Sequence, residues 1–281
     1  MCTRLSAAVC VAAAAILAGC ATRQPGTPPA PGFNLYSRQQ DVELGREAAA
    51  QVRKQYQVAQ SPELQAYVRR IGQKLASTPA AGDFPYTFTV LNDPSVNAAA
   101  LPGGPVFVNS GLISAVDSEA ELAAVIAHEI AHVELRHGTS QVSKATIIQL
   151  PATIAGAALG QGATAQIVQA GLGVGLNGLF LSYSREAESE ADALGVRIMS
   201  QAGYDPMAMA RFFNTLEASG GRRGPQFLSS HPNPGNRAAA IQTEIAAMPR
   251  QRRYNADVPG TIEMAKREVA ALPPARTPST Q

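Results

Sequence analysis

Apolar side chains recur at helical spacing in several parts of the chain. Between Pro62 and Ala76 they fall at every third or fourth position, which predicts an amphipathic helix. Further helices are predicted where apolar spacing or helix-favouring composition coincides with few Gly or Pro residues. They cover residues 41–58, Ser118 to about Arg136, about Ser184 to just before Gly203, 207–217 and 236–248. Ser118 followed by Glu121 is a capping-box pattern that marks a helix start.

Two short segments have the composition of β-strands. Residues 86–91 and 106–108 are rich in β-branched and aromatic side chains, and residues 97–101 lead into the turn at 102–105. Strands followed by several helices predict one α+β domain over residues 37–250. Residues 251–281 are predicted as a C-terminal helix and a polar tail.

The N-terminus has the pattern of a lipoprotein leader. Arg4 precedes an apolar run that is too short to span a bilayer, and the run closes with the letters LAGC, similar to a bacterial lipobox. We therefore expect a signal peptide over residues 1–19, lipid on Cys20 and a Pro/Gly-rich tether over residues 20–36. By resemblance to enterobacterial sorting, Ala21 favours the outer membrane. The alternative is an ordinary signal peptide with a chance cysteine.

The charge of the chain is low and nearly balanced. Charged residues make up 16%, the formal net charge is +2 and there is no Trp, so nothing indicates a nucleic-acid partner. Residues 145–184 contain no charged side chain. A transmembrane hairpin would fit this pattern, but scattered Gln and Pro residues interrupt every long apolar run. Helices that pack over the catalytic helix, as a lid or a membrane-facing surface, are the favoured interpretation.

The letters HEIAH at residues 128–132 lie on the helix that begins at Ser118. His128 and His132 are about 40° apart around a helix, so both can reach one zinc ion, and Glu129 lies alongside to accept a proton from water. His137 and Glu134 fall on the wrong face of a continuous helix. His137 is therefore predicted at the surface or behind the ligands.

A third ligand is predicted from the acidic segment at residues 184–192. Glu188 and Asp192 share one helical face, so one can bind the metal while the other orients a ligating His through its second ring nitrogen. Glu186 and Glu190 are predicted to do no more than complement the helix dipole.

These motifs together resemble metallopeptidase family forty-eight, the HtpX and CAAX prenyl protease type of gluzincins, and in particular its bacterial envelope lipoprotein branch. The resemblance extends over most of residues 41–237 through the segments LGREAAAQVRKQY, NAAALPGGPVFVNSGL, HEIAH, SREAESEADALG and SSHPNPGNR. It implies a mainly helical, zincin-like α+β metalloprotease domain with a small β-sheet beside the active-site helix. It also implies Glu188 as third ligand and Asp192 as the orienting carboxylate. Ala99 departs from the Phe often found there, which affects the expected substrate pocket.

The resemblance also draws attention to His231 and to Arg237, six residues later. In the envelope branch the His resembles a switch ligand that occupies the fourth zinc position and holds the enzyme inactive. A second interpretation is that His231 stabilises the oxyanion of the tetrahedral intermediate. A third is a loop His beside a proline turn.

The sequence as a whole predicts a periplasm-facing, outer-membrane-anchored endopeptidase with one Zn²⁺ per chain. We expect its substrates to be misfolded or unassembled envelope proteins, bound as an extended strand along Val106, Phe107, Val108 and Asn109. Envelope assembly machinery is a possible partner. The alternative function is a chaperone or assembly factor whose zinc site is plugged and mainly regulatory.

Overall fold

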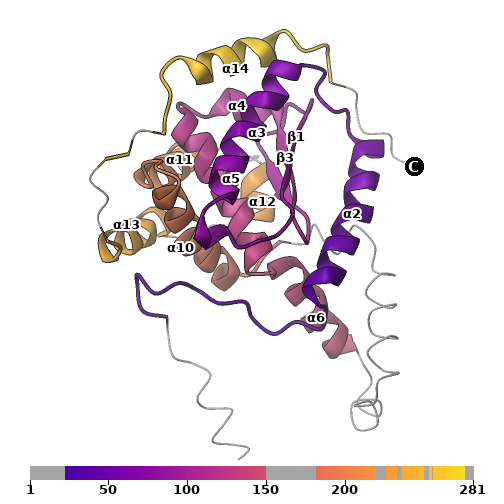
Figure 1. Cartoon of the computed structure of the whole chain (residues 1–281), viewed down its shortest axis with the longest axis vertical. Helices are drawn as coiled ribbons and strands as arrows, with labels where there is room; N and C mark the ends of the chain where they lie inside the picture. The colour runs from indigo at the N-terminus through magenta and orange to yellow at the C-terminus, as the bar shows by residue number, and fades with distance from the viewer. Residues whose placement is uncertain are drawn as a thin grey trace, which may run out of the picture.

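In a computed structural model of the chain, the predicted apolar faces meet around a central helix, α5 (Glu119–Glu134) (Figure 1). The structure describes residues 23–149, 182–218, 226–232, 236–249, 253–254 and 256–275. The other helices of these residues are α2 (Arg38–Gln55), α3 (Pro62–Ala76), the 3-10 helix η2 (Pro79–Ala81), α4 (Ser110–Ala115), α6 (His137–Gln149), α10 (Arg185–Gln201), α11 (Met207–Ala218), α12 (Gln226–Ser230), α13 (Arg237–Ala247) and α14 (Thr261–Ala270). The strands are β1 (Thr87–Leu91), β2 (Ala98–Ala100) and β3 (Pro105–Asn109). The predicted α+β, mainly helical fold is confirmed.

Most predicted elements are present within a few residues of their predicted ends, and α3 has the predicted bounds. The sequence predicts residues 97–101 only as the approach to a turn, whereas Ala98–Ala100 form β2. Three alanines have little β propensity, so their strand conformation depends on pairing with β3. The short helices α4 and α12 are not predicted from the sequence either.

The sheet places β3 in the middle, in the order β1-β3-β2. β1 pairs with β3 in parallel, Val90 opposite Val108, and β2 pairs with it in antiparallel fashion, Ala99 opposite Phe107. The predicted substrate strand along Val106, Phe107, Val108 and Asn109 is therefore wrong. Both edges of β3 already have neighbours, so a peptide cannot pair with it unless a strand is displaced.

The central helix α5 is buried along almost its whole length, with only Glu134 excepted. The side chain of Ser118 accepts a hydrogen bond from the backbone N–H of Glu121 and so caps the helix. The Glu121 carboxylate accepts a hydrogen bond from the backbone N–H of Asp117, whereas in a capping box the N–H of Ser118 would donate it. Helices α3, α10 and α11 and strand β2 pack around α5, which explains why its sequence is apolar on every side.

The contact between α5 and α10 is close because Gly195 has no side chain. A Cβ atom at Gly195 would lie 2.9 Å from Cε of Met209 and 3.3 Å from the backbone nitrogen of His128. This approach brings the polar positions of α10 next to the His residues of α5.

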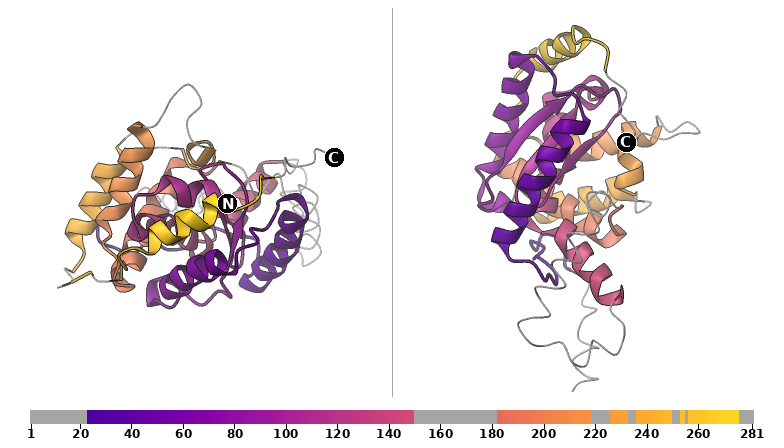
Figure 2. Two further views of the ribbon diagram at one scale, coloured as in Figure 1. Left: turned by 90° about the horizontal axis from the view of Figure 1, so that it is seen from above. Right: turned by 90° about the vertical axis from the view of Figure 1, so that its right-hand side faces the viewer.

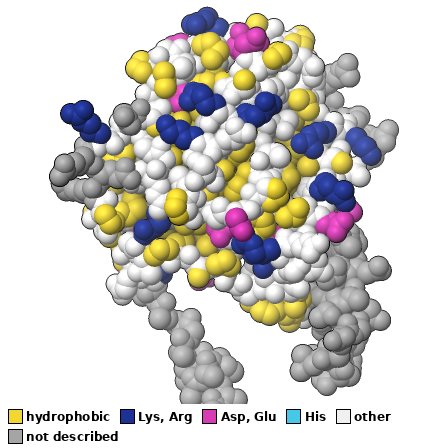
Figure 3. Space-filling view, viewed as in Figure 1, with side chains coloured by type: hydrophobic (Ala, Val, Ile, Leu, Met, Phe, Trp, Pro, Cys, Tyr) yellow, Lys and Arg dark blue, Asp and Glu magenta, His cyan; other side chains and the backbone are white. Residues whose placement is uncertain are grey.

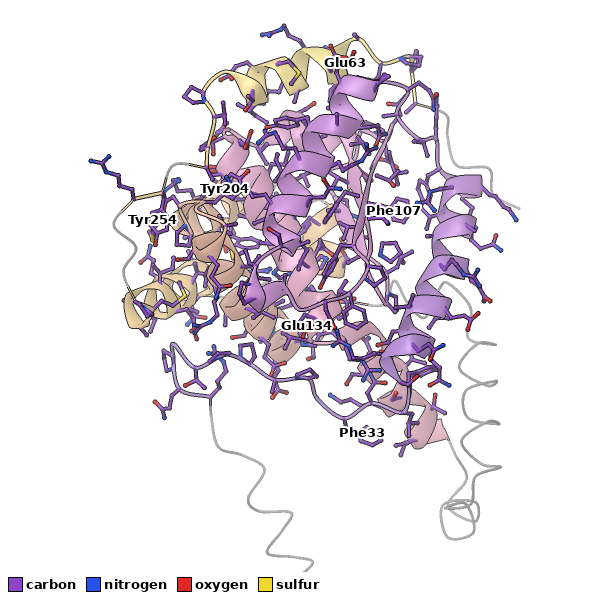
Figure 4. All side chains as sticks on the ribbon, viewed as in Figure 1. Phe33, Glu63, Phe107, Glu134, Tyr204 and Tyr254 are labelled. Carbon is purple, nitrogen blue, oxygen red and sulfur yellow. The ribbon has the colours of Figure 1, made fainter. Side chains whose placement is uncertain are left out.

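Helix α2 covers the outer face of β3. Phe107 points from β3 toward α2 (Figure 4) and packs with Ala48, Ala49 and Val52 in a second, smaller apolar cluster. Gly45 of α2 lies against the turn before β3, since a Cβ atom at Gly45 would be 1.7 Å from the carbonyl oxygen of Pro102.

The chain bends between α5 and α6 at Arg136. Its φ of 58° lies in the left-handed region, which is uncommon for a residue other than Gly. The Arg136 side chain is held by the Asp41 carboxylate and by the backbone oxygen of Tyr36. Because α5 ends at Glu134 and α6 begins at His137, these residues do not continue one helix.

Residues 23–36 lie along the domain, from α13 past α10 to α6, as Figures 1 and 2 show. The Glu244 carboxylate of α13 accepts hydrogen bonds from Arg23 and from the backbone of Gly26. Farther along, the backbone N–H of Leu35 donates to Ser143 Oγ of α6 at 3.0 Å. Backbone and side-chain hydrogen bonds thus join residues 23–36 of the predicted tether to the three helices α13, α10 and α6.

No helix among the described residues is both long enough and apolar enough to cross a membrane. The predicted signal peptide and Cys20 lie outside the described residues, as do residues 150–181, which make up most of the uncharged segment. The lipid anchor and the cover over the catalytic helix stay predictions.

Candidate metal centre

His128 and His132 lie one turn apart on the face of α5 that α10 covers. Their Nε2 atoms are 3.0 Å apart, and both rings are buried. The i, i+4 spacing predicted from the sequence thus brings two imidazole nitrogens to one point.

Helix α10 places two carboxylates beside these rings. Ser184 caps the helix, and Glu188 and Asp192 then fall one turn apart on the side facing α5. The Glu188 oxygens lie 3.4 Å from Nε2 of His128 and 3.4 Å from Nε2 of His132. Asp192 Oδ1 lies 3.0 Å from Nδ1 of His128. Glu188 therefore shares the cluster, and Asp192 contacts the opposite nitrogen of His128.

His231, which directly follows α12, completes the cluster. Its Nδ1 atom is 3.0 Å from Glu188 Oε1 and 3.2 Å from His128 Nε2. Phe227, one turn earlier, stacks on the His231 ring with centroids 4.4 Å apart. The ring is 2% exposed, so it lies inside the centre and not in a solvated loop.

The donor atoms of these four side chains fit a divalent metal ion. One donor atom from each of His128, His132, Glu188 and His231 lies within 4.8 Å of all the others. Tetrahedral ligands around zinc are about 3.3–3.4 Å apart, because the bonds are about 2.0–2.1 Å long. The contacts of 3.0–3.4 Å within the cluster are close to this spacing. Glu188 Oε2 is buried without a hydrogen-bond partner, as expected of a ligand atom.

Arg237 lies behind His128. It is 1% exposed and makes two hydrogen bonds to Asp192, from Nε and Nη2, each 2.7 Å long. Its guanidinium also covers the ring of Phe213, with Cζ 3.6 Å from the centroid. Arg237 therefore neutralises Asp192 in a buried site, and Asp192 stays available to accept a hydrogen bond from His128.

Glu129 lies on the β2 side of the centre. Its Oε2 accepts a hydrogen bond of 2.8 Å from the backbone of Ala100, and its Oε1 lies 3.3 Å from Nε2 of His231. The side chain is 1% exposed, and burial raises the pKa of its carboxyl group above the ordinary value. A carboxylate with a raised pKa accepts a proton more readily.

His137 lies behind the ligand His132, which is one of the two positions predicted for it, and it is buried and not at the surface. Its Nδ1 lies 2.9 Å from Nδ1 of His132, and its Nε2 lies 3.1 Å from Glu190 Oε2. The prediction that Glu190 does no more than complement the helix dipole is wrong. The bend at Arg136 turns His137 toward His132. Gly138 is a local sign of a helix end in the sequence. Glu134, as predicted, points away, toward Arg38.

The electrostatics of the centre favour a negative carboxylate surrounded by imidazoles. Burial opposes the charge on Glu188, yet its close contacts with the imidazoles of His128, His132 and His231 hold its pKa well below the ordinary value. Burial also opposes a charged His128, but hydrogen bonds with Asp192 and Glu188 raise its pKa to about 9. Burial lowers the pKa of His132 well below the ordinary value. The ionised Glu188 lies 3.2 Å from Arg237 Nη2 and offers a negative oxygen to a metal cation at the cluster.

The centre is closed toward solvent within the described residues. Tyr183 stacks on His132 with ring centroids 4.0 Å apart. The cavity beside them, bounded by Ala100 and Pro102, has a volume of about 10 Å³, enough for about one water molecule. No His side chain appears on the face drawn in Figure 3. Among the described residues, Tyr183 and His231 lie against each other and against His132, so these rings cover the metal ligands.

Comparison with known proteins shows the family to which the chain is related. The model described as Peptidase family M48 matches residues 62–245. The chain is 34% identical over 180 residues to mitochondrial metalloendopeptidase OMA1 of Schizosaccharomyces pombe, covering 63% of this chain and 51% of that protein. It is 30% identical over 217 residues to the beta-barrel assembly-enhancing protease of Escherichia coli, covering 74% of this chain and 44% of that protein. The chain therefore matches about half the length of these relatives, and the family resemblance drawn from its motifs is confirmed.

Proposed function

Because the chain belongs to Peptidase family M48, we propose that it is a zinc-dependent endopeptidase. The observation that carries this proposal is the buried cluster of His128, His132 and Glu188 with the carboxylate of Glu129 beside it. Two imidazoles and one carboxylate are a ligand set that suits a catalytic zinc ion, since they leave a position for water or substrate. The described cluster offers no thiolate, which separates it from structural zinc sites.

His128, His132 and Glu188 would hold the zinc ion, which when bound would supply Lewis-acid chemistry for the scissile carbonyl and the attacking water. Glu129 accepts the proton of that water and passes it to the leaving amine. Asp192 keeps the ring of His128 in a fixed orientation because its carboxylate accepts from Nδ1 of that ring, and Arg237 holds the carboxylate in place.

We place the substrate along β2, the edge strand nearest to Glu129. The N–H of Ala100 donates to the Glu129 carboxylate and does not pair with β3. A substrate carbonyl that accepts this hydrogen bond would release Glu129 Oε2 to accept the proton. Binding and activation of the base would then be coupled through one backbone N–H.

We assign His231 as a removable fourth ligand that holds the enzyme in a latent form. Support comes from its Nδ1 atom, which points into the cluster 3.0 Å from Glu188. The closed cavity beside Tyr183 also supports it, because no peptide fits there.

The proposed biological role is quality control of envelope proteins, with the domain anchored to the outer membrane through Cys20 and facing the periplasm. Support comes from the lipobox-like sequence before Ala21 and from the similarity to a relative named a beta-barrel assembly-enhancing protease. Misfolded or unassembled envelope proteins would be the substrates, and envelope assembly machinery would be a partner.

The test is the substitution Glu129→Gln. We expect full zinc content and loss of peptide hydrolysis, because Gln fills the same volume but accepts no proton. Zinc is counted by atomic absorption, and hydrolysis is followed with an unfolded protein substrate. Full hydrolytic activity in the variant refutes the mechanism.

A second candidate function is a chaperone or assembly factor with a plugged zinc site. The observation that favours it is the burial of all four cluster residues behind Tyr183. This function predicts that the Glu129→Gln chain still complements a deletion strain, whereas the protease predicts that it does not.

A further inference from the structure

We propose that Glu190 and His137 form a positioning relay that sets the tautomer and ring orientation of His132. The inference rests on the proposed function, since it treats His132 as a metal ligand. The relay runs from Glu190 Oε2 to His137 Nε2 over 3.1 Å, and from His137 Nδ1 to His132 Nδ1 over 2.9 Å. It connects α10, α6 and α5.

The direction of the hydrogen bonds follows from the chemistry of Glu190. An ionised carboxylate only accepts, so His137 must donate from Nε2. A neutral imidazole with its proton on Nε2 has a lone pair on Nδ1, so His137 then accepts from Nδ1–H of His132. His132 is left with its lone pair on Nε2.

This is the nitrogen that faces the cluster. Nε2 of His132 lies 3.0 Å from Nε2 of His128 and 3.4 Å from Glu188 Oε1. The opposite tautomer would turn an N–H toward the metal position and could not bind. The relay therefore selects the form of His132 that has a donor lone pair where a metal ion needs it.

Two carboxylates of α10 thus orient the two ligating imidazoles in different ways. Asp192 contacts His128 directly at 3.0 Å, whereas Glu190 acts on His132 through His137. The intermediate ring is needed because His132 Nδ1 faces α6 and not α10. The bend at Arg136 brings His137 to the position between Glu190 and His132.

The relay can be tested without unfolding the domain, because one of its three side chains is partly exposed. His132 and His137 are buried, but the side chain of Glu190 is 32% exposed. Substitutions at Glu190 therefore remove the end of the relay and leave the core intact.

The experiment measures zinc affinity by competition with a chromophoric chelator in the full chain. We expect Glu190→Ala and His137→Ala each to weaken zinc binding about 10–100-fold. Glu190→Gln should bind nearly as the parent does, because its amide oxygen still accepts from His137. The matched control is Glu186→Gln, an exposed carboxylate on the first turn of the same helix, and it should have no effect.

The double variant separates a relay from two independent contributions. In a His137→Ala background, Glu190→Ala should weaken zinc binding no further, because Glu190 acts only through His137. The visible spectrum of the cobalt-loaded protein should change in both single variants and be restored in Glu190→Gln.

Two outcomes contradict the relay. Unchanged affinity in folded Glu190→Ala, or additive losses in the double variant, overturns it while the proposed function stands. A parent chain that binds no zinc overturns both. Far-ultraviolet circular dichroism checks the fold, and if His137→Ala does not fold, the comparison of Glu190→Ala with Glu190→Gln still decides.

Discussion

Arg237 holds Asp192 through two hydrogen bonds of 2.7 Å, and Asp192 in turn lies 3.0 Å from Nδ1 of His128. All three side chains are buried. The pair connects α13 to α10 behind a candidate ligand, so it affects both the fold and the metal centre.

Removal of Arg237 should destabilise the chain strongly. We expect Arg237→Ala to lower the free energy of unfolding by about 3–5 kcal/mol, because it leaves the Asp192 charge buried without a partner. Arg237→Lys should fold better but weaken zinc binding about 10-fold, since an ammonium group cannot make the two-point contact. Urea denaturation and chelator competition measure the two effects. Parent-like zinc affinity in Arg237→Lys would contradict the role assigned to the pair.

Replacement of His231 should activate the enzyme. If His231 is a removable ligand, His231→Ala raises the rate of peptide hydrolysis about tenfold, which corresponds to the loss of about 1.4 kcal/mol of preference for the closed form. If His231 instead stabilises the oxyanion, the rate falls. Ser230→Ala is the matched control, because its hydroxyl bonds only to the backbone of Phe227 among the described contacts. A decrease in rate for His231→Ala would reject the latent form.

The stability of the domain should depend on pH through Glu119. The Glu119 carboxylate is fully buried and receives hydrogen bonds from Arg70, Tyr204 and Thr261. Burial opposes its charge, but these hydrogen bonds lower its pKa overall. Because the folded pKa is the lower one, the stabilisation is complete above the unfolded pKa of about 4.3 and is lost as pH falls through the folded pKa.

The test is Glu119→Gln, which should lower the free energy of unfolding by about 2 kcal/mol at neutral pH. The difference from the parent should shrink as the pH falls below about 4. Urea denaturation at a series of pH values measures it. Glu63→Gln, at an exposed residue in the first turn of α3, is the control. If the difference in unfolding free energy between parent and Glu119→Gln stayed constant down to acid pH, Glu119 would not be the source of the pH dependence.

Gly45 and Gly138 both face Pro102 but should respond to Ala in opposite ways. A Cβ atom at Gly45 would lie 1.7 Å from the Pro102 carbonyl oxygen, whereas one at Gly138 would lie 3.6 Å from Pro102 Cγ. We expect Gly45→Ala to lower the free energy of unfolding by about 1–3 kcal/mol. Gly138→Ala should be neutral or stabilising by up to about 1 kcal/mol, since Ala favours a helix. Urea denaturation measures both, and equal changes in the free energy of unfolding for the two variants would be inconsistent with a close contact between α2 and Pro102.

The docking of residues 23–36 should protect them from proteolysis. Glu244→Ala removes the acceptor for Arg23 and Gly26. We expect cleavage within residues 23–36 by a nonspecific protease to become about tenfold faster, as the loss of about 1.4 kcal/mol would give. Gln242→Ala, an exposed neighbour on α13, is the control. Equal cleavage rates in parent and Glu244→Ala, measured by mass spectrometry, would show that these contacts do not hold the segment.

The sequence alone determined whatever depends on the spacing within one helix. The bounds of α3 follow from its apolar face and its Ser61 cap. The convergence of His128 with His132, and of Glu188 with Asp192, follows from the 3.6-residue turn. These relationships are local, so a residue pattern is enough to predict them.

Only the tertiary structure decided which of these groups meet and where the substrate can pair. The middle position of β3 depends on the partners on both of its sides, and no residue of Val106–Asn109 reveals it. The contact of His137 with His132 depends on a left-handed conformation at Arg136, which the Asp41 carboxylate and the Tyr36 carbonyl hold from another part of the chain. Such contacts between distant segments are set by packing, which residue spacing does not encode.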